Sequence, residues 1–188
     1  MNMNVAALVV IALLAGLAIG AAVIYFLQRS RTVRLQERFG PEYARTVADK
    51  GDRWKAESDL ERRRRRVERL HIRPLEPARR SRFEETWRDI QARFVDSPQA
   101  TVTEADRLIM EVMSEEGYPV EDFEQQAADI SVEHPRVVDN YREGHAIAVR
   151  QGQGRADTED LRRAMIHYRA LFEDLLGQGE LARTEGRA

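Results

Sequence analysis

The hydrophobic pattern of the chain begins with an apolar segment, residues 5–27, in which none of the 23 side chains is charged. A helix of this length extends over roughly 34 Å, which is enough to cross a hydrocarbon core of about 30 Å with some tilt. The pattern therefore predicts a transmembrane anchor at residues 1–27, followed by a polar domain that the anchor tethers to a membrane.

Basic residues follow the anchor directly, at Arg29, Arg31, Arg34 and Arg38. Because basic residues next to a span stay on the cytoplasmic side, we expect a single-pass protein of the bacterial inner membrane, with its N-terminus outside and its polar domain in the cytoplasm. The alternative is a cleaved signal peptide and a secreted or periplasmic domain. It is disfavoured because signal peptides begin with a basic region, whereas residues 1–4 contain no Lys or Arg.

Small residues recur every four positions within the anchor. Ala12, Gly16 and Gly20 therefore share one helix face, and such a face lets two membrane helices approach each other closely. This face is a candidate for pairing two copies of the chain into a homodimer. The alternative is that it faces lipid, since Gly is common in membrane helices.

The segment at residues 28–76 has the pattern of a basic helical neck with a connector. A first helix is expected to stop at Gly40 and a second to start at Pro41, because Gly suits the left-handed position after a helix and Pro suits the first helical position. An apolar stripe predicts that this second helix runs to about Leu70, with Gly51 as a weak point. The stripe consists of Tyr43, Val47, Trp54 and Leu60.

Six arginines on the neck are candidate anion- or lipid-binding residues, namely Arg62, Arg63, Arg64, Arg65, Arg66 and Arg69. We call the first five the arginine run. One interpretation is a solvated helix face balanced by the nearby Glu57, Asp59, Glu61 and Glu68. A second is docking on anionic lipid, which requires the chain to fold back at Gly40 and Pro41. Nucleic-acid binding is the least favoured, because no aromatic stacking platform accompanies the run.

Residues 77–176 show helical periodicity and no alternation typical of strands. Five apolar stripes predict a bundle of four or five helices, because none of the stripes could be buried alone. The stripes consist of Phe83, Trp87, Ile90 and Phe94; Leu108, Ile109, Val112 and Met113; Val120, Phe123, Ala127 and Ile130; Val137, Val138, Tyr141, His145 and Ala148; and Leu161, Met165, Tyr168, Phe172 and Leu175. The predicted fold class is all-α.

Capping residues and glycines set the predicted ends of the bundle helices. We expect the second of them to start after Thr101 or Thr103, and the last to have Thr158 as its N-cap. Gly177 is expected to end the last helix, which leaves residues 177–188 as a frayed tail.

The net charge of −2 conceals a polarity along the chain. Residues 29–82 carry 18 basic and 9 acidic side chains, whereas residues 83–188 carry 12 basic and 23 acidic ones. The neck is therefore basic and the bundle acidic. We expect the acidic bundle to dock either on its own basic neck or on a basic partner, with binding that strengthens at low salt.

Candidate catalytic chemistry is sparse in this sequence. The chain has no cysteine, which excludes disulfides and thiolate metal sites. Its four histidines, at positions 71, 134, 145 and 167, form no His-Glu-x-x-His motif, and the one Glu-x-x-His spacing, from Glu68 to His71, has no second copy, which a di-metal site requires. We therefore predict no catalytic, cofactor-binding or metal-binding residue, and no enzyme activity.

Six short runs carry a resemblance to other sequences. They read ERFGPEY at residues 37–43, HIRPL at 71–75, QARFV at 91–95, GYPVEDF at 117–123, HPRVV at 134–138 and HYRALF at 167–172. These runs resemble a bacterial group of single-pass membrane-anchored or secreted helical proteins that have no known activity. The resemblance covers nearly the whole chain and implies one recurring architecture, but no activity, cofactor or site residue.

The sequence thus favours a membrane-anchored interaction or adaptor protein that presents a cytoplasmic helical bundle to a protein partner. The alternative function is a regulator that binds anionic lipid, or less readily nucleic acid, through the arginine run. No small-molecule substrate is indicated by any motif.

Overall fold

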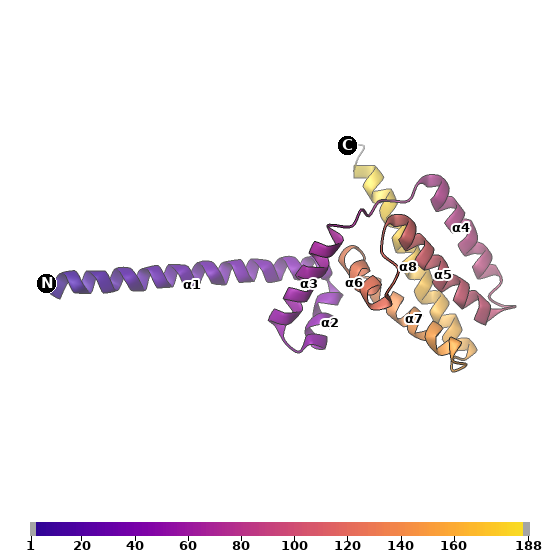
Figure 1. The fold of residues 1–188 in the computed structure, drawn as a ribbon, viewed down its shortest axis with the longest axis horizontal. Helices are drawn as coiled ribbons and strands as arrows, with labels where there is room; N and C mark the ends of the chain where they lie inside the picture. The colour runs from indigo at the N-terminus through magenta and orange to yellow at the C-terminus, as the bar shows by residue number, and fades with distance from the viewer. Residues whose placement is uncertain (1–2, 186–188) are drawn as a thin grey trace. The chain divides into compact units, whose positions relative to one another are not determined.

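The computed structural model is all-helical throughout the part of the chain that it describes, as the sequence predicted (Figure 1). It describes the backbone of residues 3–185 and the side chains of residues 13, 14 and 16–177. The helices in this range are α1 (Met3–Phe39), α2 (Pro41–Lys50), α3 (Arg53–Val67), α4 (Pro77–Ala92), α5 (Pro98–Glu116), α6 (Phe123–Glu133), α7 (Val138–Gly152) and α8 (Thr158–Glu185). They belong to two compact units, Met1–Arg38 and Phe39–Ala188.

The first unit is formed by α1, which contains the predicted anchor. The large apolar side chains described in the anchor are exposed in this single chain, Leu17 to 73%. Where side chains are described, no helix is long and apolar enough to cross a membrane. The transmembrane span therefore stays a prediction, and the side chains of residues 1–12 and of Ala15 lie outside the description.

The neck helices α2 and α3 form a hairpin in the second unit (Figure 1). The expected break before Pro41 is present, with Gly40 at a φ of +46°. The prediction of one helix to about Leu70 is wrong, because Gly51 ends α2 at a φ of +63° and the Asp52 side chain caps α3 by accepting from the backbone of Lys55 at 2.8 Å.

The apolar stripe expected on the neck is only partly buried. Leu60 and Tyr43 are buried, whereas Trp54 is 71% exposed. The break at Gly51 changes the rotational register between the two helices, so that Trp54 no longer shares a face with Tyr43. The predicted position of Trp54 on the packing face is therefore wrong.

The bundle consists of α4 to α8, with α8 packed against both α5 and α7 (Figure 1). Helix α4 covers α5, and α6 packs against α7 and against α3 of the neck. The predicted stripes supply the core, in which the Trp87 and Phe172 rings stack with centroids 4.9 Å apart. The apolar core lies where α5, α7 and α8 meet, and its largest fully buried side chains are Tyr141, Tyr168, Ile109, Met113, Ile130, Leu161, Leu171, Leu175 and Val102.

Three predicted helix boundaries differ from the observed ones. Helix α5 begins at Pro98, earlier than expected, because Pro suits the first helical turn. The N-cap of α8 is Asp157, one residue before the predicted Thr158, and its carboxylate accepts from the backbone of Asp160 at 2.7 Å. Helix α8 continues to Glu185 instead of ending at Gly177.

The connector between α3 and α4 is fixed on the end of α5. Gly117 has a φ of +101°, and a Cβ atom there would lie 2.7 Å from the carbonyl oxygen of His71. Only glycine permits this approach, since any side chain would be strained and would clash with the connector backbone. The backbone N–H of Arg73 donates to the carbonyl of Glu116 at 2.9 Å, which completes the attachment.

Candidate functional site

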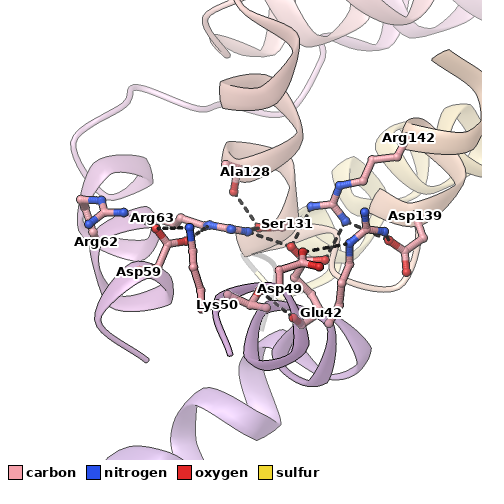
Figure 2. Close-up of polar contacts among 12 residues, drawn as sticks. Glu42, Asp49, Lys50, Asp59, Arg62, Arg63, Ala128, Ser131, Asp139 and Arg142 are labelled. Carbon is pink, nitrogen blue, oxygen red and sulfur yellow. Dashed lines mark hydrogen bonds and ion pairs between the residues drawn. The ribbon is translucent and has the colours of Figure 1, made fainter. Parts of the chain in front are cut away.

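Every guanidinium of the arginine run has an acidic partner in the structure; Figure 2 shows those of Arg62 and Arg63. Three carboxylates on α3 or just beyond it supply local pairs, as the solvated-face interpretation predicted. Asp59 pairs with Arg62 and Arg63, Glu61 with Arg64 and Arg65, and Glu68 with Arg64. Glu57, the fourth expected partner, instead accepts from Arg53 and from the Tyr43 hydroxyl.

Two members of the run reach other helices. Arg63 binds Glu42 of α2 at 2.8 Å and also donates to the Ser131 hydroxyl of α6 at 3.3 Å. Arg66 donates from Nε to both oxygens of the fully buried Asp129 of α6, at 2.9 and 3.0 Å. Arg63 and Arg66 thus join the neck hairpin to the bundle. We call the network of ion pairs between the hairpin and the bundle the seam; it consists of Glu42, Arg45, Arg63, Arg66, Asp129, Asp139 and Arg142.

Glu42 lies at the centre of this seam (Figure 2). Its side chain is only 1% exposed. Arg142 of α7 donates two hydrogen bonds to its carboxylate, both at 2.7 Å, and Arg63 donates a third from the other side. Asp139 extends the network by accepting from Arg142 at 2.8 Å and from Arg45 of α2 at 2.5 Å. A buried carboxylate is tolerated only when such pairing replaces its hydration.

The other sequence-predicted site residues lie outside the seam. Arg69 is exposed and forms no ion pair within the described residues. A Cβ atom on Gly16 or Gly20 would meet no atom of this chain within 4 Å, so both positions leave the surface of α1 open. The side chain of Ala12 lies outside the described residues. Pairing through this face stays a prediction.

A cavity of about 300 Å³ lies where the ends of α3, α5 and α6 meet the connector. Val67 and Leu70 contribute apolar walls, together with Ile72 and Pro74 of the connector. The polar lining residues are Glu68, Arg73, Glu116, Tyr118, Glu133 and His134. No motif in the sequence had pointed to this site.

Glu116 and Tyr118 are the unusual members of the cavity wall. They are only 6% and 3% exposed, and Glu116 Oε2 and the Tyr118 hydroxyl have no hydrogen-bond partner among the described residues. Burial raises the pKa of Glu116 to about 8, so its carboxyl is mostly protonated at neutral pH. Burial, followed by the nearby charges of Glu116, Glu133 and Asp129, also raises the pKa of Tyr118.

The buried histidine of the cavity, His134, is held by the bundle. Its Nδ1 lies 2.5 Å from Asp174 of α8. His145 and His167 are packed elsewhere, the former stacked on Phe123 with centroids 3.8 Å apart. Among the described residues, no group of three or more His, Cys, Asp or Glu side chains is arranged to hold a metal ion.

One signal in the sequence could have revealed Glu116. It lies four residues after Val112 and three after Met113, which places its carboxyl on the apolar stripe of α5. A charged residue at a core-facing position of a helix is a candidate site residue, because burying it unpaired is costly. The partners around it come from other helices and follow from no local pattern.

No protein-family model matches the chain, and neither a curated protein nor a solved structure matches it. Besides the apolar segment of α1, two features of the molecule bear on function. These are the ion-pair seam between the neck and the bundle, and the cavity with its two unpartnered polar groups.

We predict that Glu116→Gln changes how stability depends on pH. The folded state keeps a proton on Glu116 that the unfolded chain releases near its ordinary pKa of about 4.5. The free energy of unfolding therefore falls as pH rises from about 4.5 to about 8, and this fall is absent in the glutamine variant. At pH 9 the variant should be more stable by on the order of 5 kcal/mol, measured by chemical denaturation of the full-length chain.

The matched control for this prediction is Glu111→Gln, the same chemical change at an exposed position of α5. It should leave the pH profile of the wild-type chain almost unchanged. Parallel profiles for the wild-type chain and Glu116→Gln would show that Glu116 is not a buried neutral carboxyl.

Proposed function

We propose that the protein is a membrane-anchored adaptor, in which a single span at residues 5–27 holds a helical domain at the cytoplasmic face of a bacterial inner membrane. The apolar length of the segment and its arginine flank support this placement. The exposed apolar side chains of α1 support it as well, because a surface of this kind is stable only when it is covered by lipid or by another apolar surface.

The cavity between α3, α5 and α6 is the observation that carries the adaptor function. Glu116 and Tyr118 each bury a polar atom without a partner in the described chain. A buried polar group without a hydrogen bond costs about 1 to 3 kcal/mol, so a bound group that supplies the missing hydrogen bonds would recover this free energy. The partner of the adaptor is a protein that contacts the domain at this cavity.

The alternative function uses the arginine run as a docking surface for anionic lipid or nucleic acid. It has less support, because each of the five guanidiniums already binds a carboxylate and two of them are tied to α2 or α6. Arg69 lies apart from these pairs, and one exposed arginine gains only about 1 kcal/mol at an anionic membrane.

The membrane placement predicts a labelling pattern that the absence of native cysteine makes simple to test. In Val95→Cys the new thiol occupies a position that is 87% exposed on the helical domain. It should react with a membrane-impermeant maleimide only after the inner membrane is permeabilised, whereas Asn2→Cys should react in intact spheroplasts. Labelling of Val95→Cys in intact spheroplasts would instead favour the secreted or periplasmic alternative.

The adaptor function predicts that a protein lies next to the cavity in native membranes. A photoreactive amino acid at position 74, an exposed residue of the cavity rim, should form an adduct with a second protein when the full-length chain is irradiated in its membrane. The same amino acid at position 95, which is exposed away from the cavity, is the matched control. An adduct pattern that is identical at both positions, or no protein adduct at position 74, would contradict the proposed function.

A further inference from the structure

Three helices point their C-terminal ends at the cavity. Val67 is the last residue of α3, Glu116 of α5 and Glu133 of α6, and all three residues line it. The C-terminal end of a helix carries a partial negative charge of about half an elementary charge, which favours cations within the last turn. The backbone of the site is therefore arranged for a positively charged group.

The side chains of the cavity have the same preference. Glu68, Glu116 and Glu133 bring three carboxyl groups, against the basic side chain of Arg73. Glu68 is already paired with Arg64, and His134 with Asp174, so neither decides the preference of the site. The three helix ends, together with the carboxyl that Glu116 can ionise, favour a cation over an anion.

The size of the cavity and its unpaired hydrogen-bond acceptors favour a guanidinium over an ammonium or a metal ion. A volume of about 300 Å³ is far larger than a metal ion and accommodates the end of an extended side chain. A planar guanidinium offers five N–H donors and binds a carboxylate through two parallel hydrogen bonds, whereas an ammonium offers three donors from one point. Glu116 and Tyr118 supply acceptors that lack a donor among the described residues.

We infer that this cavity binds a guanidinium group, carried by an arginine side chain of the protein partner, with Glu116 and Tyr118 as its principal acceptors. This inference rests on the proposed function, since the partner is the source of the arginine. The same chemistry on a free small guanidine is the competing source, and the experiment below separates the two.

Binding should be coupled to a proton on Glu116. Without a cation the carboxyl is buried and neutral, and a guanidinium stabilises its ionised form, so that binding releases a proton and tightens as pH rises towards 8. The other titratable or charged groups that line the cavity with Glu116 are Glu68, Arg73, Tyr118, Glu133 and His134. A variant with glutamine at position 116 should lose the pH dependence because it has no proton to release.

The probes for the test are ethylguanidinium, ethylammonium and the peptide acetyl-Gly-Arg-Gly-amide, each added to the full-length chain in mild detergent at constant ionic strength. The measurement is the NMR shift of labelled tyrosine rings, in which Tyr118 reports on the cavity. We expect a saturable shift of Tyr118 with ethylguanidinium, affinity for the peptide at least as high, and weaker binding of ethylammonium. Glu116→Gln should weaken peptide binding by about tenfold or more, whereas Glu111→Gln should leave it unchanged.

Several results would overturn the inference. Equal effects of ethylguanidinium and ethylammonium, or binding unaffected by Glu116→Gln, would show that the cavity does not recognise a guanidinium. Binding of ethylguanidinium without binding of the peptide would identify a small guanidine as the source and exclude the partner's arginine. If photo-crosslinking at position 74 captures a protein while no probe shifts Tyr118, the adaptor function stands and the guanidinium inference fails.

Discussion

The architecture of the second unit depends on a carboxylate that is almost completely removed from water. Glu42 of α2 lies between Arg63 of α3 and Arg142 of α7, and both guanidiniums bind it directly. A buried charge of this kind contributes little net stability when it is paired, but removing its partner costs about 3 to 5 kcal/mol. The network consequently favours the arrangement in which the neck hairpin lies on α6 and α7, because any other placement would leave a buried charge without its partner.

A second ion pair of the seam joins two of the helices that end at the cavity. Arg66 of α3 binds Asp129 of α6, and the cavity begins at the C-terminal ends of these two helices. Asp129 also acts on Tyr118, whose hydroxyl is buried in the cavity wall. The seam and the cavity are therefore neighbouring regions between α3 and α6, and only the cavity holds polar groups without a partner among the described residues.

Local patterns in the sequence predicted the elements of this fold but not the contacts between them. Helical periodicity identified the bundle stripes, and Gly40 with Pro41 marked a break, because both signals depend on neighbouring residues. Glu42 and Arg142 are 100 positions apart, and no spacing rule connects them. The local carboxylates of the arginine run could be expected from their spacing, whereas Glu42 and Asp129 reach the run from other helices and could not. Glu116 could have been predicted as a candidate site residue, because it is a charged residue on the apolar stripe of α5.

Hydrogen exchange of the backbone amides is the measurement that tests the role of Glu42 most directly. In the full-length wild-type chain, the amides of α2 and α3 should exchange as slowly as those of α5 and α8, because the seam makes the hairpin part of one cooperative unit. In Glu42→Gln the hairpin amides should exchange at least about tenfold faster while α5 and α8 remain protected. Asp49→Asn, a similar change at an exposed position of α2, serves as the control. Rapid exchange of the hairpin in the wild-type chain, or unchanged exchange in Glu42→Gln, would contradict the account.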